Sequence, residues 1–171
     1  MTIADLLDNK SLKPKAKTET LSKWLLDSTI SADELIRYAE QAKDPAKGTC
    51  IEALEYATKE RPKVANKNVF RFVSECLREK APRVKWESAK VIGNTAHLFT
   101  GDLDEIIPSL IDNSEHEGTV VRWSAAFALG QILKLKTKHN KNLLPAMESI
   151  CKRESNNGVR KIYLDAIRKT Q

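Results

Sequence analysis

Two kinds of side chain that bind ligands recur along this chain at one fixed spacing. Tryptophans occupy positions 86 and 123, which are 37 residues apart, and a basic residue directly precedes each of them. The basic residues belong to a column with steps of 38, 37 and 38 residues, made up of Lys47, Lys85, Arg122 and Arg160. A cationic side chain can clamp a phosphate or carboxylate, and an exposed indole ring can anchor a peptide or stack on a base. These residue types point to binding chemistry.

Residues suited to other chemistry are scattered. The chain has no G-x-x-x-x-G-K-[ST] or G-x-G-x-x-G loop to hold a phosphate or a dinucleotide. The three cysteines have no C-x-x-C spacing for zinc, and the three histidines fall on separate predicted elements; these residues are Cys50, Cys76, Cys151, His97, His116 and His139. We expect no catalytic residue, no metal site and no cofactor.

The spacing of the chemical residues is the spacing of a structural repeat. Val84, Val121 and Val159 each precede a basic residue and then small or apolar residues at helical spacing, and a weaker copy begins at Ala46. A second apolar column, 37 residues per step, is formed by Ile36, Val73, Leu110 and Met147. The pattern predicts a helix A, a short turn and a helix B, repeated four times over residues 31–61, 62–99, 100–136 and 137–171 as one continuous domain. Residues 1–30 are expected to hold capping helices, including one over 19–27, and a basic linker over 10–17.

The motifs of helix B resemble a known family. Asp44-Pro45-x-Lys47 and the stretch VRWSAAFALG at 121–130 are similar to the second helix of HEAT repeats, and the resemblance covers about residues 31–170. The period is shorter than the usual HEAT repeat, so the chain is better described as HEAT-like; tetratricopeptide repeats compete in length, but their Trp-Leu-Gly-Tyr signature is missing. The resemblance implies an all-α, right-handed α-α solenoid of about four helix pairs with an N-terminal capping helix, in which helix B lines the concave surface.

A helical wheel of helix B separates a core side from an opposite side. In the third unit the core side holds Val121, Ala125, Ala126, Leu129, Ile132 and Leu133. The opposite side, which includes Gly93 and Gly130, is where we expect a partner-binding groove formed by Trp86, Lys90, Trp123, Phe127, Lys134, Lys161 and Arg168. An alternative is that both tryptophans pack between adjacent repeats and expose only their edges. The basic column, by the resemblance, either ties neighbouring turns together or clamps an anion.

Two enzyme groups within the HEAT-like fold can be compared with these residues. The di-iron hydroxylases hold metal with His-Glu pairs directly after the Val-basic pair, where this chain has Trp86-Glu87 and Trp123-Ser124, and its lone His116-Glu117 lies in a turn. The alkylpurine DNA glycosylases use concave tryptophans with an Arg and an Asp. The counterpart here would be Asp165, which is expected to form surface ion pairs with its neighbours on the helix.

The sequence therefore predicts a non-enzymatic HEAT-like scaffold that binds a protein or peptide segment, for which lysines on the groove would favour acidic residues. A net charge of +6 and a pI near 9.2 keep nucleic acid open as the alternative partner, including kinship with the HEAT-like glycosylases. No run of about 18 apolar residues suggests a membrane span. Unpaired cysteines inside helical patterns lead us to expect a cytoplasmic protein.

Overall fold

The computed structural model describes residues 1–171, which form ten α-helices, three short 3-10 helices and no strand. None of these helices combines the length and the apolar composition that crossing a bilayer requires. In chain order the elements are α1 (Ile3–Asp8), α2 (Pro14–Leu26), α3 (Ala32–Gln41), α4 (Ala46–Glu60), η1 (Pro62–Val64), α5 (Lys67–Cys76), α6 (Pro82–Thr95), η2 (Ala96–Leu98), η3 (Thr100–Asp102), α7 (Ile106–Asn113), α8 (Thr119–Lys134), α9 (Asn140–Arg153) and α10 (Asn157–Thr170).

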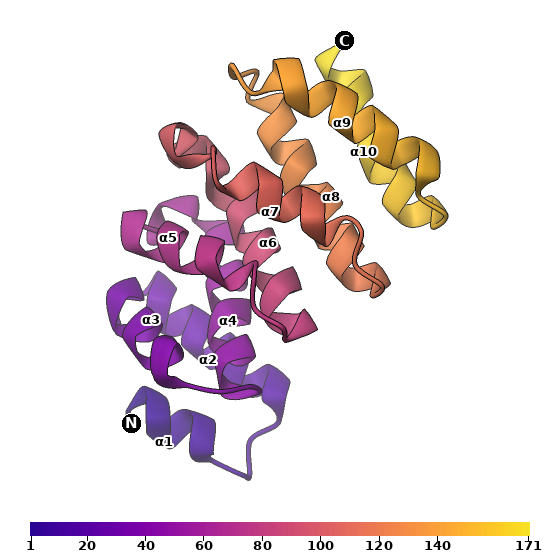
Figure 1. Ribbon diagram of the computed structural model, residues 1–171. Helices are drawn as coiled ribbons and strands as arrows, with labels where there is room; N and C mark the ends of the chain where they lie inside the picture. The colour runs from indigo at the N-terminus through magenta and orange to yellow at the C-terminus, as the bar shows by residue number, and fades with distance from the viewer.

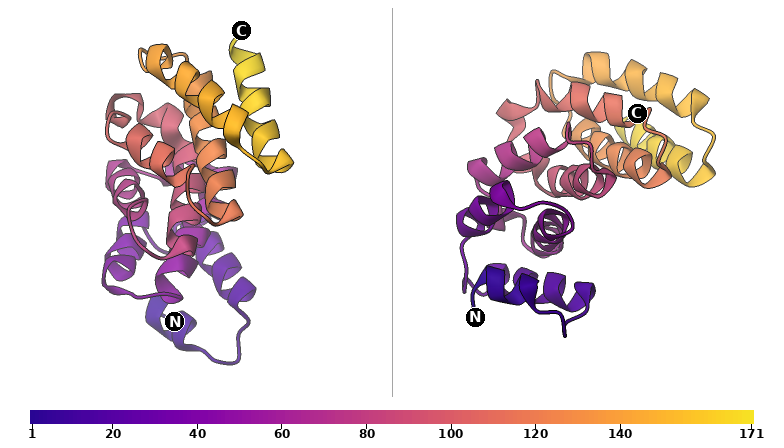
Figure 2. Two further views of the ribbon diagram at one scale, coloured as in Figure 1. Left: turned by 45° about the vertical axis from the view of Figure 1, so that its right-hand side comes forward. Right: turned by 60° about the horizontal axis from the view of Figure 1, so that its bottom comes forward.

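The helices alternate between two layers of a curved array (Figure 1). The even-numbered helices pack one against the next, α2 on α4, α4 on α6, α6 on α8 and α8 on α10. They form the inner layer, and α3, α5, α7 and α9 run along the outer side of the curve (Figure 2, right). This arrangement confirms the predicted all-α solenoid of helix pairs.

The core lies between the layers and continues through the whole array. In α8 every residue of the predicted core side is buried, with at most 1% of the side chain exposed at Val121 and none at Leu129. Because apolar residues recur at the same positions in each unit, successive helix pairs bury the same faces and one continuous core results. The core side of the helical wheel is confirmed.

The N-terminal region corrects one detail of the sequence prediction. Residues 10–17 are not a linker throughout, because α2 begins at Pro14. Proline is favoured at the first position of a helix, where its missing N–H costs no hydrogen bond. With α1, this helix makes a short fifth pair that buries Leu21 and Leu25 against the array. The stripe of α2 that faces away is polar: Lys15 and Glu19 form an exposed ion pair.

Candidate functional site

Aromatic and aliphatic side chains meet on the inner layer at α6 and α8. Trp123 is 40% exposed and stacks on Phe127, with ring centroids 5.9 Å apart and planes 12° from parallel. Val120, at the start of α8, is 52% exposed, and Trp86 on α6 is half-buried. We call Trp86, Val120, Trp123 and Phe127 the aromatic surface. Of the two tryptophans, Trp123 is the more accessible, and Trp86 matches the expectation of a partly covered ring.

Two glycines next to this surface are buried, although the wheel placed them opposite the core. A Cβ at Gly93 would lie 2.4 Å from Cε1 of Phe127, so the ring rests directly on the backbone of α6. A Cβ at Gly130 would lie 3.1 Å from Cβ of Ala166 on α10. The absence of a side chain lets the next inner helix approach closely. Gly93 and Gly130 therefore lie at contacts between neighbouring inner helices and are not part of a free surface.

Two buried carboxylates, which sequence reasoning did not single out, lie beside Trp86. Glu87 and Glu55 are only 3% and 5% exposed. The Trp86 Nε1–H donates to Glu87 Oε1 over 2.8 Å, and Lys90 Nζ lies 3.3 Å from Glu87 Oε2 and 3.8 Å from Glu55 Oε2. Burial raises the pKa of Glu87 above its ordinary range, against the opposing effect of the Lys90 charge. Lys90 is therefore neutralised within the protein and is not a free cation for a partner. The only signal in the sequence was the i, i+3 spacing of Glu87 and Lys90.

A second polar contact joins the inner helices further towards the N-terminus. Arg83 on α6 pairs with Glu52 on α4 at 2.8 Å. Thr18 on α2 donates its hydroxyl hydrogen to the same carboxylate, also at 2.8 Å. One carboxylate on α4 thus links three consecutive inner helices.

The remaining cations of the predicted groove are unpaired. Neither Lys134 on α8 nor Lys161 and Arg168 on α10 forms an ion pair. The ion pairs expected between Asp165 and its helix neighbours are also not formed, so that prediction was wrong. These three unpaired cations lie on the last two inner helices of the array.

The basic column lies at the turns between helices, and we call it the basic ladder. Its first three residues each reach a side chain at the end of the outer helix, or in the turn after it, in the following repeat: Lys47 pairs with Glu79, Lys85 Nζ donates to Asn113 Oδ1 (3.1 Å), and Arg122 Nε donates to Glu154 Oε2 (3.0 Å). Lys85 and Arg122 also donate to backbone carbonyls of their own turn. The fourth, Arg160, donates only to the carbonyl oxygen of Glu154 in its own turn, at 3.0 and 2.6 Å. The first three side chains are engaged within the array and bind no external anion in this arrangement.

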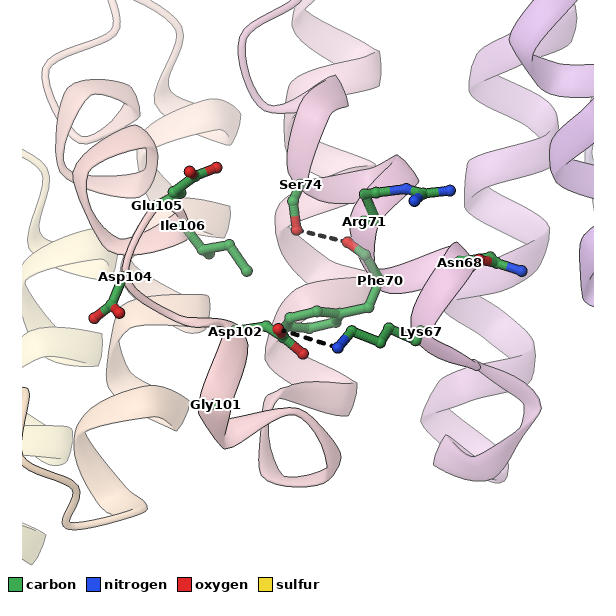
Figure 3. A pocket seen from close by; sticks show the side chains of 10 residues that line it. All are labelled: Lys67, Asn68, Phe70, Arg71, Ser74, Gly101, Asp102, Asp104, Glu105 and Ile106. Atoms are coloured by element: carbon green, nitrogen blue, oxygen red, sulfur yellow. Dashed lines mark hydrogen bonds and ion pairs between the residues drawn. The ribbon is translucent and has the colours of Figure 1, made fainter.

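One hollow lies away from the aromatic surface. It has a volume of about 470 Å³ and opens between α5 and the segment that leads into α7 (Figure 3). Phe70, stacked on Phe99 at 4.5 Å, forms its apolar floor, and Lys67 faces Asp102 at 3.6 Å across it. A comparable hollow of about 320 Å³ separates α7 from α9. Such hollows recur because the outer helices of a curved array are spread apart. Neither of these two hollows is lined by a residue of the aromatic surface.

The cysteines are buried, and the side chains that could hold a metal are dispersed. All three cysteines are buried free thiols, and burial raises the pKa of Cys50 and of Cys76 to about 12. A thiol with so high a pKa holds almost no thiolate at neutral pH, and the thiolate is the nucleophile. No group of three or more His, Cys, Asp or Glu side chains gathers closely enough to hold a metal ion.

Comparison with known proteins identifies the class of this fold. No protein-family model matches the chain, and no curated protein matches it in sequence. Among solved structures, a designed armadillo repeat protein in complex with the peptide (KR)4 superimposes with a TM-score of 0.73 at 16% identity, covering 99% of this chain and 80% of that one. A computationally designed armadillo repeat protein for modular peptide recognition gives 0.76 at 14% identity, over 99% and 81% of the two chains. The complex of CpcE and CpcF of phycocyanin lyase from Nostoc sp. PCC7120 gives 0.69 at 14% identity, over 96% and 94%. The fold is an α-solenoid of helix pairs, like that of armadillo/HEAT-like helical repeat proteins.

Proposed function

We propose that this protein is a non-enzymatic binding module that holds an extended segment of another protein on the inner layer of its solenoid. The observation that carries the proposal is the exposed ring of Trp123, stacked on Phe127 beside the exposed Val120. Large aromatic side chains dominate the binding energy of protein interfaces. Here Trp123 is held in place by Phe127 before any ligand binds, which lowers the entropy cost of binding.

The shape of the surface favours a macromolecular ligand. Trp123 and Val120 of the aromatic surface are exposed to solvent, whereas small-molecule sites are concave and enclose most of the ligand. An extended peptide can lie across neighbouring inner helices and place alternate side chains on the exposed rings. Two of the structural neighbours described above are peptide-recognition proteins of the same fold, which supports this class of ligand.

The charges on the inner layer favour acidic residues in that segment. Lys134 and Lys161 are unpaired, while Lys90 is offset by two buried carboxylates near Trp86. We therefore infer that the ligand places apolar side chains over α6 and α8 and acidic side chains towards α10. The neighbour that binds (KR)4 takes a basic peptide, but at 16% identity its charged residues do not transfer to this chain.

A fluorescence titration tests the proposal. Intrinsic tryptophan emission would be followed while the protein is titrated with an octapeptide of alternating Glu and Leu, with (KR)4 and with single-stranded DNA. The acidic peptide should bind, and Trp123→Ala should weaken it at least tenfold because loss of an anchoring aromatic commonly costs 2 kcal/mol or more. Lys161→Gln should weaken binding less. Lys152→Gln, the same charge change on the outer helix α9, serves as the matched control and should have no effect.

The salt dependence distinguishes the two partner classes. If three cations contacted phosphates, raising salt from 50 to 200 mM would weaken DNA binding by roughly 20- to 40-fold. A peptide anchored by aromatic side chains should respond far less. DNA binding with that steep salt slope, together with no response to the acidic peptide, would replace the protein-binding proposal by nucleic-acid binding. Release of an alkylated base that disappears in Asp165→Asn would contradict the non-enzymatic assignment.

A further inference from the structure

The positive charge of this protein is concentrated in α9, α10 and the turn before them. Residues 134–171 contain ten Lys and Arg against three Asp and Glu, whereas residues 1–133 contain 19 Lys and Arg and 20 Asp and Glu. The net charge of +6 therefore comes entirely from the segment that leaves α8 and continues through α9 and α10. Charge asymmetry of this kind along a chain indicates a polyanionic partner, such as nucleic acid or a membrane surface.

The fold gathers part of this charge at one edge of the array. The α8–α9 turn contributes Lys136 and Lys138, the start of α9 contributes Lys141, and the end of α10 contributes Lys169. Because α10 packs on both α8 and α9 and runs in the opposite direction to α9, these segments lie at the same edge (Figure 1). All four side chains are exposed and none forms an ion pair. We call these four lysines the basic edge.

The backbone at Lys136 gives independent evidence at this edge. Lys136 follows Leu135, the C-cap residue of α8, and adopts a left-handed conformation with φ 53°. Glycine is favoured at this position after a helix, because a Cβ is disfavoured in the left-handed region. The other non-glycine residue with a positive φ is Ser28, at 64°. A lysine at position 136 costs folding stability that a glycine would not, which points to a role for its charged side chain.

The turn that carries these lysines is fixed by hydrogen bonds. Asn140 Nδ2 and the Lys136 N–H both donate to the carbonyl oxygen of Leu133, at 2.9 and 3.2 Å. The His139 N–H donates to Thr137 Oγ1 over 3.2 Å. The backbone from which the lysines extend is therefore ordered before any ligand binds, which lowers the entropy cost of binding.

The side chains of this region favour a duplex over a single strand. Tyr163 is the only Phe, Trp or Tyr residue between 134 and 171, and it is fully buried. No such ring is thus available here for an unpaired base to stack on. A duplex stacks its own bases and presents its phosphates, which lysines contact without reading sequence.

Other polyanions fit this edge less well. The α8–α9 turn and α9 expose no large apolar side chain, which an interface with a folded protein would use as an anchor. A membrane surface is wider than the basic edge and would also meet the acidic start of α7. There Glu105 is exposed, and Asp104 Oδ1 lies only 3.5 Å from His139 Nε2 in the lysine-bearing turn. A narrow polyanion can contact the lysines and avoid these carboxylates.

We propose that the basic edge binds double-stranded nucleic acid through its phosphate backbone, without sequence preference. With four lysine–phosphate contacts, the logarithm of the affinity should fall with the logarithm of the salt concentration at a slope of about −3.6. Raising salt from 50 to 200 mM would then weaken binding by about 150-fold. Because the basic edge is separate from the aromatic surface, this binding does not depend on the peptide-binding function proposed above.

Fluorescence anisotropy of a fluorescein-labelled DNA duplex of about 20 base pairs, titrated with the full chain, measures this binding. The double variant Lys136→Gln/Lys138→Gln should bind at least tenfold more weakly at about 100 mM salt, and its salt slope should be shallower by about 2. Lys10→Gln/Lys13→Gln removes the same charge from two exposed lysines near the N-terminus and should leave binding unchanged. Trp123→Ala should also leave it unchanged, so failure here and failure of the peptide site are distinguishable.

Lys136→Gly separates the cation from the fold. Glycine adopts the left-handed conformation without steric cost, so this variant should unfold at the wild-type temperature or above it while binding the duplex severalfold more weakly. Ser28→Gly makes the matched backbone change without loss of charge and should leave duplex binding unchanged. If Lys136 had only a structural role, Lys136→Gly would bind as tightly as the wild type.

Four results would overturn the proposal. Undiminished duplex binding in both Lys136 variants would place the site elsewhere. An equal loss in Lys10→Gln/Lys13→Gln would mean that net charge alone holds the duplex. Equal affinity for polyglutamate of matched charge would indicate an acidic protein segment as the ligand. Co-sedimentation with vesicles of phosphatidylcholine and phosphatidylserine in equal parts, lost in the double variant, would assign the edge to a membrane surface.

Discussion

The contact between Phe127 and the backbone of α6 can be tested by giving Gly93 a side chain. In Gly93→Ala the new Cβ would lie 2.4 Å from Cε1 and 2.7 Å from Cδ1 of Phe127, whereas carbon atoms in contact prefer about 3.5–4.0 Å. The ring must move by about 1 Å or more, and Trp123 stacked behind it limits that movement. Overpacking of this kind costs about 1–3 kcal/mol, and the higher helix propensity of alanine returns about 1 kcal/mol. We expect a net loss of about 1 kcal/mol.

A double-mutant cycle measured by urea unfolding isolates the contact. In a Phe127→Ala background the obstructing ring is gone, so Gly93→Ala should stabilise the protein by up to about 1 kcal/mol. The coupling free energy between the two sites should therefore exceed about 1 kcal/mol, beyond the 0.3–0.5 kcal/mol scatter of independent sites. Gly101→Ala, where a Cβ meets nothing within 4 Å, is the control for added bulk without contact. A coupling indistinguishable from zero would refute the close packing described for α6 and α8.

Four further substitutions have defined outcomes. Leu129→Asp places an unpaired charge at a fully buried site and should abolish the helical circular dichroism signal. Trp123→Ala should cost about 1–2 kcal/mol in thermal unfolding, less than the 3–5 kcal/mol of a buried tryptophan, because the ring is 40% exposed. Burial alone would raise the pKa of Glu154, but the Asn156 N–H and the Arg122 side chain hold the folded pKa below its ordinary value of 4.5. The stability that ionised Glu154 contributes is therefore present above pH 4.5 and is lost as the pH falls through the lower folded pKa. We expect the stability of Glu154→Gln to depend less on pH below about 4.5. The pH dependence expected from Glu87 has the opposite sign, because burial raises its folded pKa. As the pH falls, the folded state binds a proton before the unfolded state does, so the wild type should gain stability relative to Glu87→Gln as the pH falls towards 4.5. Urea titrations at each pH would measure this difference.

The architecture was predictable because a solenoid is specified locally. Each helix pair contacts only its neighbours, so the recurrence of residues such as Val84 and Val121 every 37 or 38 positions fixes both the fold and the core. The same pattern also places Trp123, a large aromatic residue, on the side of its helix opposite the core. The sequence indicates the N-terminal pair less clearly, because its pattern places Pro14 in a basic linker, whereas α2 begins at this residue.

The site was predicted less completely, since a helical wheel contains one helix and no neighbours. It cannot reveal that Gly93 is covered by a ring from the next helix. Nor does it indicate that Glu87 and Glu55 are buried, because charged residues are assigned to solvent unless a partner on another helix is known. Lys90 looked free for the same reason, and Asp165 looked paired because its neighbours along the helix carry the opposite charge. For Gly93, Glu55 and Lys90 the sequence did not reveal the contact between repeats.

The inner helices are joined by two different kinds of contact, and this gives the array uneven mechanical compliance. Between α4 and α6 the inner contact is made by long charged side chains, Arg83 with Glu52 and Lys90 with Glu55. Between α6, α8 and α10 it is made by backbone-close packing at Gly93 and Gly130. The Arg83–Glu52 pair is the more exposed of the two and is weakened as salt screens it, whereas close packing is not. Added salt is therefore expected to weaken the α4–α6 contact at Arg83 more than the contacts at Gly93 and Gly130.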